Sequence, residues 1–158
     1  MAELLGPVHA QSSSSPRVFI AQLQSLTGTV WPGDFDNDGV TDLAGTGASD
    51  NRVAVAIGVG DGTFRAPIAT SFTGHVLGTA DFNNDGRRDL IVDSQPFASS
   101  GIAILPGKGD GTFGAARTVA AYDGATFALT ADFDGDGMRD LAIAANRTSS
   151  ISTRATTI

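Results

Sequence analysis

The chain has 158 residues, which suffices for one domain of ordinary size. Its 10 basic and 17 acidic residues give a net charge of -7, which argues against binding to nucleic acid or to an anionic membrane surface. There is no cysteine, so disulfides and thiol chemistry are excluded. No apolar run approaches the roughly 20 residues that span a bilayer, and no membrane insertion is predicted.

The N-terminal segment, residues 1–16, is predicted to be a flexible leader because it contains a run of serines followed by Pro16. Its start, Met1-Ala2-Glu3, is not basic and leads into no long apolar run, so no signal peptide is predicted in this chain. Val18 to Ala21 is expected to be a spare strand, since it resembles the last strand of the units described next.

An internal repeat fills most of the chain. Segments of ten residues begin at positions 34, 81 and 132 and read DFDNDGVTDL, DFNNDGRRDL and DFDGDGMRDL. A second motif, Gly-Asp-Gly-Thr-Phe, begins at positions 60 and 109. Two motifs that recur at nearly the same spacing indicate duplicated structural units.

Each unit contains short apolar segments in a fixed order. Val53 to Ile57 runs into the first Gly-Asp-Gly-Thr-Phe turn, Pro67 to Ser71 closes the first unit, and Val76 to Ala80 opens the second. Such short, partly alternating segments, separated by Gly, Asn and Asp, are typical of β-strands joined by hairpins. Asp61-Gly62 and Asp110-Gly111 are predicted to supply the positive backbone angles of tight turns.

Four strands in a unit of about 50 residues correspond to one blade of a β-propeller. The predicted fold is therefore all-β, with about three blades of four-stranded antiparallel sheet per chain. The blades extend over about residues 17–72, 73–122 and 123–158, and the last is partial because it lacks the second motif.

The acidic residues concentrate in the ten-residue segments, which hold 11 of the 17, and only Glu3 is a glutamate. A hard cation such as calcium takes about six to eight oxygen ligands, which carboxylates at alternating loop positions deliver. Positions 1, 3, 5 and 9 carry Asp or Asn, a glycine at position 6 permits a sharp turn, and position 7 offers its carbonyl. The predicted ligands are Asp34, Asp36, Asp38, the Val40 carbonyl and Asp42; Asp81, Asn83, Asp85, the Arg87 carbonyl and Asp89; and Asp132, Asp134, Asp136, the Met138 carbonyl and Asp140.

These loops resemble the first half of an EF-hand, which needs a glutamate at position 12. Position 12 is Gly45, Val92 or Ile143, so the EF-hand is rejected. Asp-rich turns with solvated carboxylates are the alternative, but three matches in register disfavour it. Magnesium gives up its water reluctantly, so we predict about three calcium sites per chain, with binding coupled to folding.

The Asp loops, together with Phe64-Arg65-Ala66-Pro67 and Phe113-Gly114-Ala115-Ala116, resemble FG-GAP repeats, as in the β-propeller of integrin α-subunits. The amino-acid sequences of both motifs are most similar to those of bacterial VCBS-type members and of certain fungal lectins. The resemblance covers about residues 17 to 146. It implies calcium-bound blades, an extracellular or cell-surface setting, and a role in adhesion or in binding glycans or proteins.

Propellers of this family usually have about seven blades, whereas this chain has material for about three. Three sheets cannot close a ring, and their end edges would stay exposed. We therefore expect either a fragment of a longer protein or a homo-oligomer that completes the ring. The spare strand could fill the fourth place of the last blade, in the same chain or in a neighbour.

The predicted function is extracellular binding or adhesion to a protein or glycan, with structural calcium. One alternative is a lectin assembled from several chains; its available aromatic faces are Trp31, Phe72, Phe97 and Tyr122, although packing between blades is the favoured role of each. The other is a non-catalytic fragment of a larger secreted enzyme or adhesin.

No catalytic activity is predicted. His9 lies in the leader and His75 between two blades, and neither has a partnered nucleophile in the sequence. The chain contains no P-loop and no Gly-x-Gly-x-x-Gly after a strand, so no nucleotide is expected.

Overall fold

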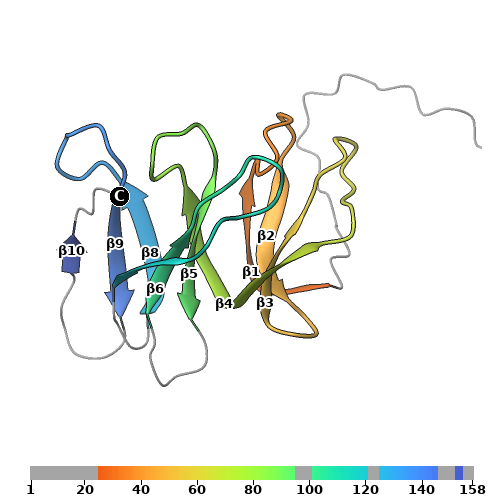
Figure 1. The fold of residues 1–158 in the computed structure, drawn as a ribbon, viewed down its shortest axis with the longest axis horizontal. Helices are drawn as coiled ribbons and strands as arrows, with labels where there is room; N and C mark the ends of the chain where they lie inside the picture. The colour runs from red at the N-terminus through yellow and green to blue at the C-terminus, as the bar shows by residue number, and fades with distance from the viewer. Residues whose placement is uncertain (1–24, 95–100, 121–124, 146–151, 155–158) are drawn as a thin grey trace, which may run out of the picture.

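The computed structural model describes residues 25–94, 101–120, 125–145 and 152–154, which form strands and turns without any helix (Figure 1). The prediction of an all-β fold is confirmed. Within these residues no helix is long and apolar enough to cross a membrane. The strands are β1 (Leu26–Gly33), β2 (Asp42–Gly47), β3 (Arg52–Ala56), β4 (Ile68–Ala80), β5 (Asp89–Ser94), β6 (Ile102–Leu105), β7 (Arg117–Ala120), β8 (Ala125–Ala131), β9 (Asp140–Ala145) and β10 (Ser152–Arg154).

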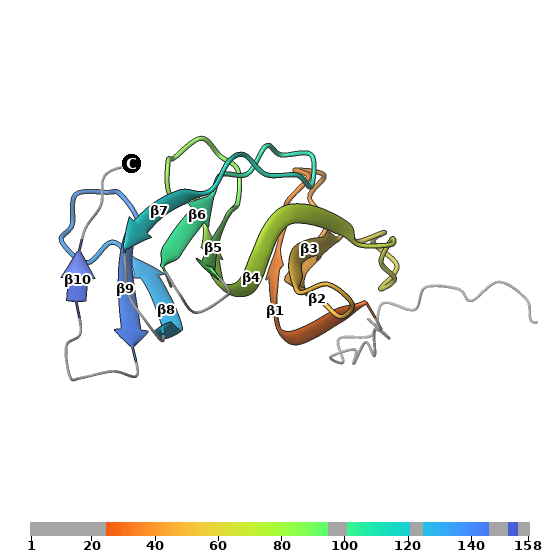
Figure 2. The same cartoon turned by 60° about the horizontal axis from the view of Figure 1, so that its bottom comes forward.

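The strands pair in chain order. β1 to β7 form one sheet in the order β1-β2-β3-β4-β5-β6-β7, and β8, β9 and β10 form another, with every pair antiparallel. Turning the molecule shows that the large sheet is strongly curled (Figure 2). The strands therefore stand as propeller-like blades: a first blade of β1 to β4, a second of β4 to β7, and a third of β8 to β10.

β4 belongs to both complete blades. Its first half pairs with β3 through Ile68 and Ala69, and its second half pairs with β5 from Gly74 to Ala80. The prediction of separate strands here is therefore wrong. Gly74 makes the passage possible, because its φ is 154° and a Cβ would stand 1.8 Å from the Asp93 carbonyl oxygen. Only glycine fits that position.

The core lies between blades, since successive side chains of a strand point to opposite faces. One buried cluster, between the first and second blades, comprises Phe35, Ala44, Val53, Val55, Ile57, Val76, Leu90, Val92, Ala103 and Leu105. A second cluster, between the second and third blades, comprises Leu77, Ala80, Phe82, Ile91, Ile102, Ile104, Ala128, Leu141 and Ile143. The second blade is thus covered on both faces, as in a propeller.

The Gly-Asp-Gly-Thr-Phe turns have positive φ at their glycines, 88° at Gly60 and 94° at Gly62, rather than at Asp61. The prediction was therefore right for Gly62 and wrong for Asp61, and Asp110 differs from Gly111 in the same way. Asp61 instead folds the turn by accepting hydrogen bonds from the hydroxyl and the amide of Thr63, at 2.6 and 2.9 Å. The hydroxyl, and then the amide, lowers the pKa of Asp61 below its ordinary value.

The predicted leader of residues 1–16, the expected strand from Val18 to Ala21, Phe97 and Tyr122 lie outside the described residues.

Candidate metal centres

The three Asp loops lie along one edge of the molecule, at the top of Figure 1. They connect β1 to β2, β4 to β5 and β8 to β9. The Asn37 side chain donates to the Gly86 carbonyl at 3.4 Å, and the Asn84 side chain lies 3.1 Å from the Met138 sulfur. Neighbouring loops are therefore in contact.

Each loop turns sharply at positions 4 and 6. In the first loop φ is 59° at Asn37 and 82° at Gly39, and the other loops have Asn84 or Gly135 at position 4. Asparagine tolerates this left-handed conformation better than most residues. The turn brings backbone amides onto the position-1 carboxylate, so that Asp34 accepts hydrogen bonds from Asp38 at 3.2 Å and from Gly39 at 2.9 Å.

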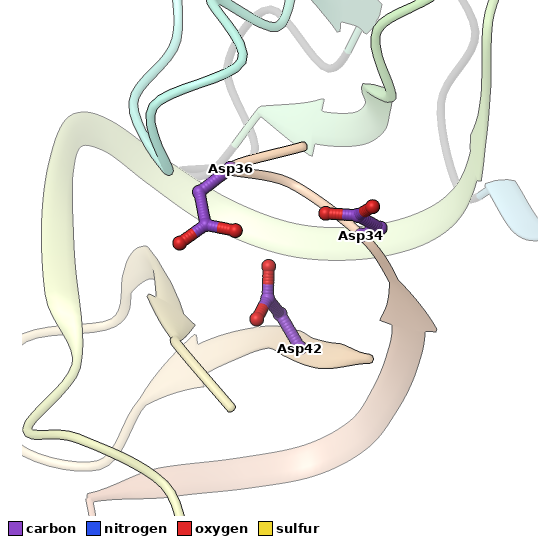
Figure 3. Close-up of side chains that lie close together, drawn as sticks. All are labelled: Asp34, Asp36 and Asp42. Carbon is purple, nitrogen blue, oxygen red and sulfur yellow. The ribbon is translucent and has the colours of Figure 1, made fainter. Parts of the chain in front are cut away.

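Carboxylates of two loops converge. Oxygens of Asp34, Asp36 and Asp42 all lie within 4.8 Å of one another, and Figure 3 shows the three groups facing a common point. Asp132, Asp134 and Asp140 form the same arrangement in the third loop. These are positions 1, 3 and 9 of each loop, and the donors are all oxygen, which suits a hard cation.

The second loop has the same plan with one carboxylate fewer. Asn83 stands at position 3 and donates from its side-chain amide to Asp85 at 3.0 Å. Asp81 accepts from the amides of Asp85 and Gly86 at 3.1 and 2.9 Å, as Asp34 does in the first loop. The amide oxygen of Asn83 is a weaker ligand than a carboxylate, but it is of the same kind.

Electrostatic crowding is visible at Asp36. Partial desolvation raises the pKa of this carboxyl, and the nearby charges of Asp42 and Asp38 raise it further. A bound cation would remove this repulsion, because an opposite charge favours the ionised form. The first and third loops thus have the donor chemistry and the close approach that a metal ion requires.

The position-5 aspartates are placed differently. The carboxylates of Asp38, Asp85 and Asp136 accept hydrogen bonds from the amides at position 7, at 2.7, 2.9 and 2.7 Å. They are not members of the convergent groups. Their role as ligands, and that of the carbonyls of Val40, Arg87 and Met138, stays a prediction.

The position-9 aspartates are buried and tie two segments together. Asp42, Asp89 and Asp140 are 0%, 1% and 5% exposed. Asp42 accepts from Phe35 at 2.7 Å, inside its own loop, and from Gly58 at 2.8 Å, at the entrance of the following turn.

We call this pair of hydrogen bonds, from the aspartate's own loop and from the following turn, the clasp. The second blade repeats it. Asp89 accepts from Phe82 at 2.9 Å and from Gly107 at 2.8 Å. Burial raises the pKa of Asp89, while these two backbone amides oppose the shift. In the third loop Asp140 accepts from Phe133 at 2.8 Å.

Two glycines that the sequence analysis did not single out make the clasp possible. A Cβ on Gly58 would stand 2.4 Å from the Thr41 carbonyl oxygen, and one on Gly107 would stand 2.1 Å from that of Arg88. Any side chain would therefore push the donating amide away from the aspartate. The signal was present, since both turns begin Gly-x-Gly-Asp-Gly-Thr-Phe, with an additional glycine two residues before the motif.

Two of the aromatic residues considered for sugar stacking, Trp31 and Phe72, are engaged in packing. Trp31 is partly buried against the core between the first and second blades, and its Nε1 donates to the Val76 carbonyl at 3.0 Å. Phe72 packs against the same core and also lines a cleft of about 250 Å³ beside Phe113. His75 lies 3.3 Å from the carboxylate of Asp93 on the neighbouring strand.

Curled antiparallel blades with acidic loops on one edge define a β-propeller-like repeat protein. A sequence profile of FG-GAP-like repeats matches residues 34–92 and again residues 81–143. These matches cover more than half of the chain, which therefore belongs to the FG-GAP-like repeat family. Repeats of this family are typical of extracellular proteins. No curated protein matches the chain.

Proposed function

We propose that the chain is a calcium-stabilised, non-catalytic β-propeller module that binds a protein or glycan ligand outside the cell. The observation that carries the proposal is the convergence of Asp34, Asp36 and Asp42 within 4.8 Å, repeated by the equivalent residues of the third loop.

Calcium fits these loops better than magnesium does. All the predicted donors are carboxylate, amide or carbonyl oxygens, and calcium accepts many such ligands in flexible geometry. Magnesium retains several waters and rarely occupies a cage built from protein groups alone. The ion would be structural, because it would hold together carboxylates that otherwise repel one another.

Calcium titration by calorimetry, together with thermal unfolding in calcium and in chelator, tests this proposal. We expect about three calcium ions per chain and a higher Tm in calcium, with a much weaker effect of magnesium. Asp134→Asn should weaken one site about tenfold. Asp61→Asn is the matched control, because Asp61 lies in a turn outside the convergent groups. Absence of calcium binding, or a Tm indifferent to chelation, contradicts the proposal.

The proposed absence of catalysis rests on how the loop carboxylates are engaged. Asp34 and Asp42 accept hydrogen bonds from amides of their own loop, an arrangement that suits ion ligands rather than a proton donor and acceptor facing a substrate. Hydrolysis of glycoside or ester substrates by the calcium-loaded chain, abolished by Asp36→Asn, would overturn this part.

A lectin is the alternative function, and the cleft beside β4 is the observation that favours it. Phe72 and Phe113 line it together with the hydroxyl-bearing residues Thr70, Ser71 and Thr112. An apolar ring beside hydroxyl groups suits a sugar. A glycan array should then show binding that Thr112→Val reduces and Thr27→Val, outside the cleft, does not.

A further inference from the structure

The outer face of the third blade exposes two large apolar side chains, Phe133 and Leu129. Phe35 and Phe82, at position 2 of the first and second loops, are 2% and 3% exposed and pack between blades. Phe133, at position 2 of the third loop, is 51% exposed. Leu129 is 53% exposed, and its counterpart in the first blade is Trp31, which packs against the second blade.

The interface between the first and second blades shows what covers such a face. Phe113, from the turn of the second blade, meets Phe35 edge to face, with ring centroids 5.9 Å apart. The Gly111 amide in the same turn donates to the Phe35 carbonyl at 2.9 Å. The loop phenylalanine of one blade is therefore covered by the Gly-Asp-Gly-Thr-Phe turn of the next.

The first blade carries the same turn on the opposite end of the molecule. Phe64 and Gly62 occupy the positions that Phe113 and Gly111 hold in the second blade. Phe64 is partly exposed and packs against Ala54 and Ala56, on the face of β3 that is turned away from the second blade. In the part of the chain that the structure describes, the Gly62 amide has no hydrogen-bond partner.

This first-blade face is also apolar. Val30 is 37% exposed, and its Cγ1 lies 3.1 Å from the place where a Cβ of Gly45 would stand. The two ends of the molecule thus carry the two halves of an interface that also occurs inside it, with the loop phenylalanine at one end and the turn phenylalanine at the other.

We propose that the third blade docks on the first blade of a second copy, head to tail. Phe133 meets Phe64 of the second copy as Phe35 meets Phe113, and the Gly62 amide of that copy donates to the Phe133 carbonyl. The occupant is a second copy because the chain itself carries both complementary faces. Since the faces differ, the contact is heterologous, and repetition of it either closes a ring or extends a filament. This inference goes beyond the proposed function and does not depend on which ion the loops bind.

Sedimentation of the full chain over a range of concentrations, in calcium and in chelator, tests the docking. We expect the chain to assemble reversibly at protein concentrations up to about 100 µM. Phe133→Asp and Leu129→Asp should each raise the dissociation constant of this assembly at least about 100-fold. Val59→Lys is the matched control, because Val59 is 49% exposed and Lys108 occupies the equivalent position of the second blade. A monomer at every concentration in both solutions overturns the proposal, as does assembly that both variants leave unchanged.

Cross-linking shows whether the contact is head to tail. The chain has no cysteine, so Phe133→Cys and Val30→Cys variants each carry a single thiol. A short bismaleimide should join the two variants when they are mixed and should join neither to itself. Efficient linkage of Phe133→Cys to itself would mean a symmetric contact and overturn the proposal. Should Phe133→Asp not fold, Val30→Asp on the opposite face must cause the same loss of assembly.

Discussion

The aspartates of one loop divide into two environments. Asp42 is fully buried and accepts two backbone hydrogen bonds that join its loop to the next turn, whereas the Asp34 and Asp36 carboxylates lie near solvent and face a shared point. All belong to the same regular pattern in the sequence. The pattern therefore combines a structural clasp with an ion cage, and the two contributions can be separated by substitution.

Asp42→Ala should have the largest effect. It leaves the amides of Phe35 and Gly58 buried without an acceptor, and each such loss costs about 1–3 kcal/mol. We expect the free energy of unfolding to fall by about 3 kcal/mol in urea titrations, in chelator as well as in calcium. A loss confined to calcium would mean that Asp42 is only an ion ligand.

Asp36→Asn should show the opposite dependence. In chelator the change should be neutral or slightly stabilising, because it removes a charge whose partial desolvation and repulsion by Asp42 raise the pKa of Asp36. In calcium at about 100 times the original Kd, a site weakened about tenfold should cost about 1.3 kcal/mol. The same urea titrations measure both. Equal losses in the two solutions would remove the distinction between cage and clasp.

Asn83→Asp tests the ion cage by adding a carboxylate, where Asp36→Asn removes one. It gives the second loop the third carboxylate that the first and third loops already have. Calorimetry should show about tenfold tighter binding at one site, accompanied by a small loss of stability in chelator. Unchanged affinity would indicate that position 3 does not contact the ion.

Asn84→Ala tests the left-handed backbone conformation at position 4 of the second loop. Asn84 has a φ of 54°, a conformation that costs alanine about 1 kcal/mol. Asn84→Gly is the matched control, because the third loop has Gly135 at this position with a φ of 81°. Alanine should destabilise and glycine should not, as measured by thermal unfolding.

The smallest effect concerns an aspartate outside the loops. Because the folded state lowers the pKa of Asp61, its contribution to stability is present above the unfolded pKa of about 3.9 and is lost as the pH falls through the folded pKa. Thr63→Ala removes the hydroxyl donor, so an NMR titration should show the pKa of Asp61 rising part of the way to its ordinary value. Thr112→Ala, in the second blade, should leave Asp61 unchanged and move Asp110.

The parts of the fold that depend on local spacing could be predicted from the sequence. The loop positions follow from the motif alone, since Asp34 is folded onto Gly39 only five residues away. The recurrence of Gly58 and Gly107 is visible in the sequence, but their partner is not, because Gly58 reaches Asp42 only once β2 and β3 have paired. The continuity of β4 was missed for the same reason, since it depends on the close approach of Gly74 to Asp93 across strands.

The shared strand also has a consequence for how such a chain can change over generations. The two family matches begin at residues 34 and 81, so one repeat period runs from residue 34 to residue 80 and includes β2, β3 and β4. Each such unit contributes strands to two successive blades. Duplication or deletion of one unit by recombination would therefore leave each remaining pair of successive blades joined by one continuous strand, as β4 joins the first two. The number of blades can change while the register of each sheet is inherited intact.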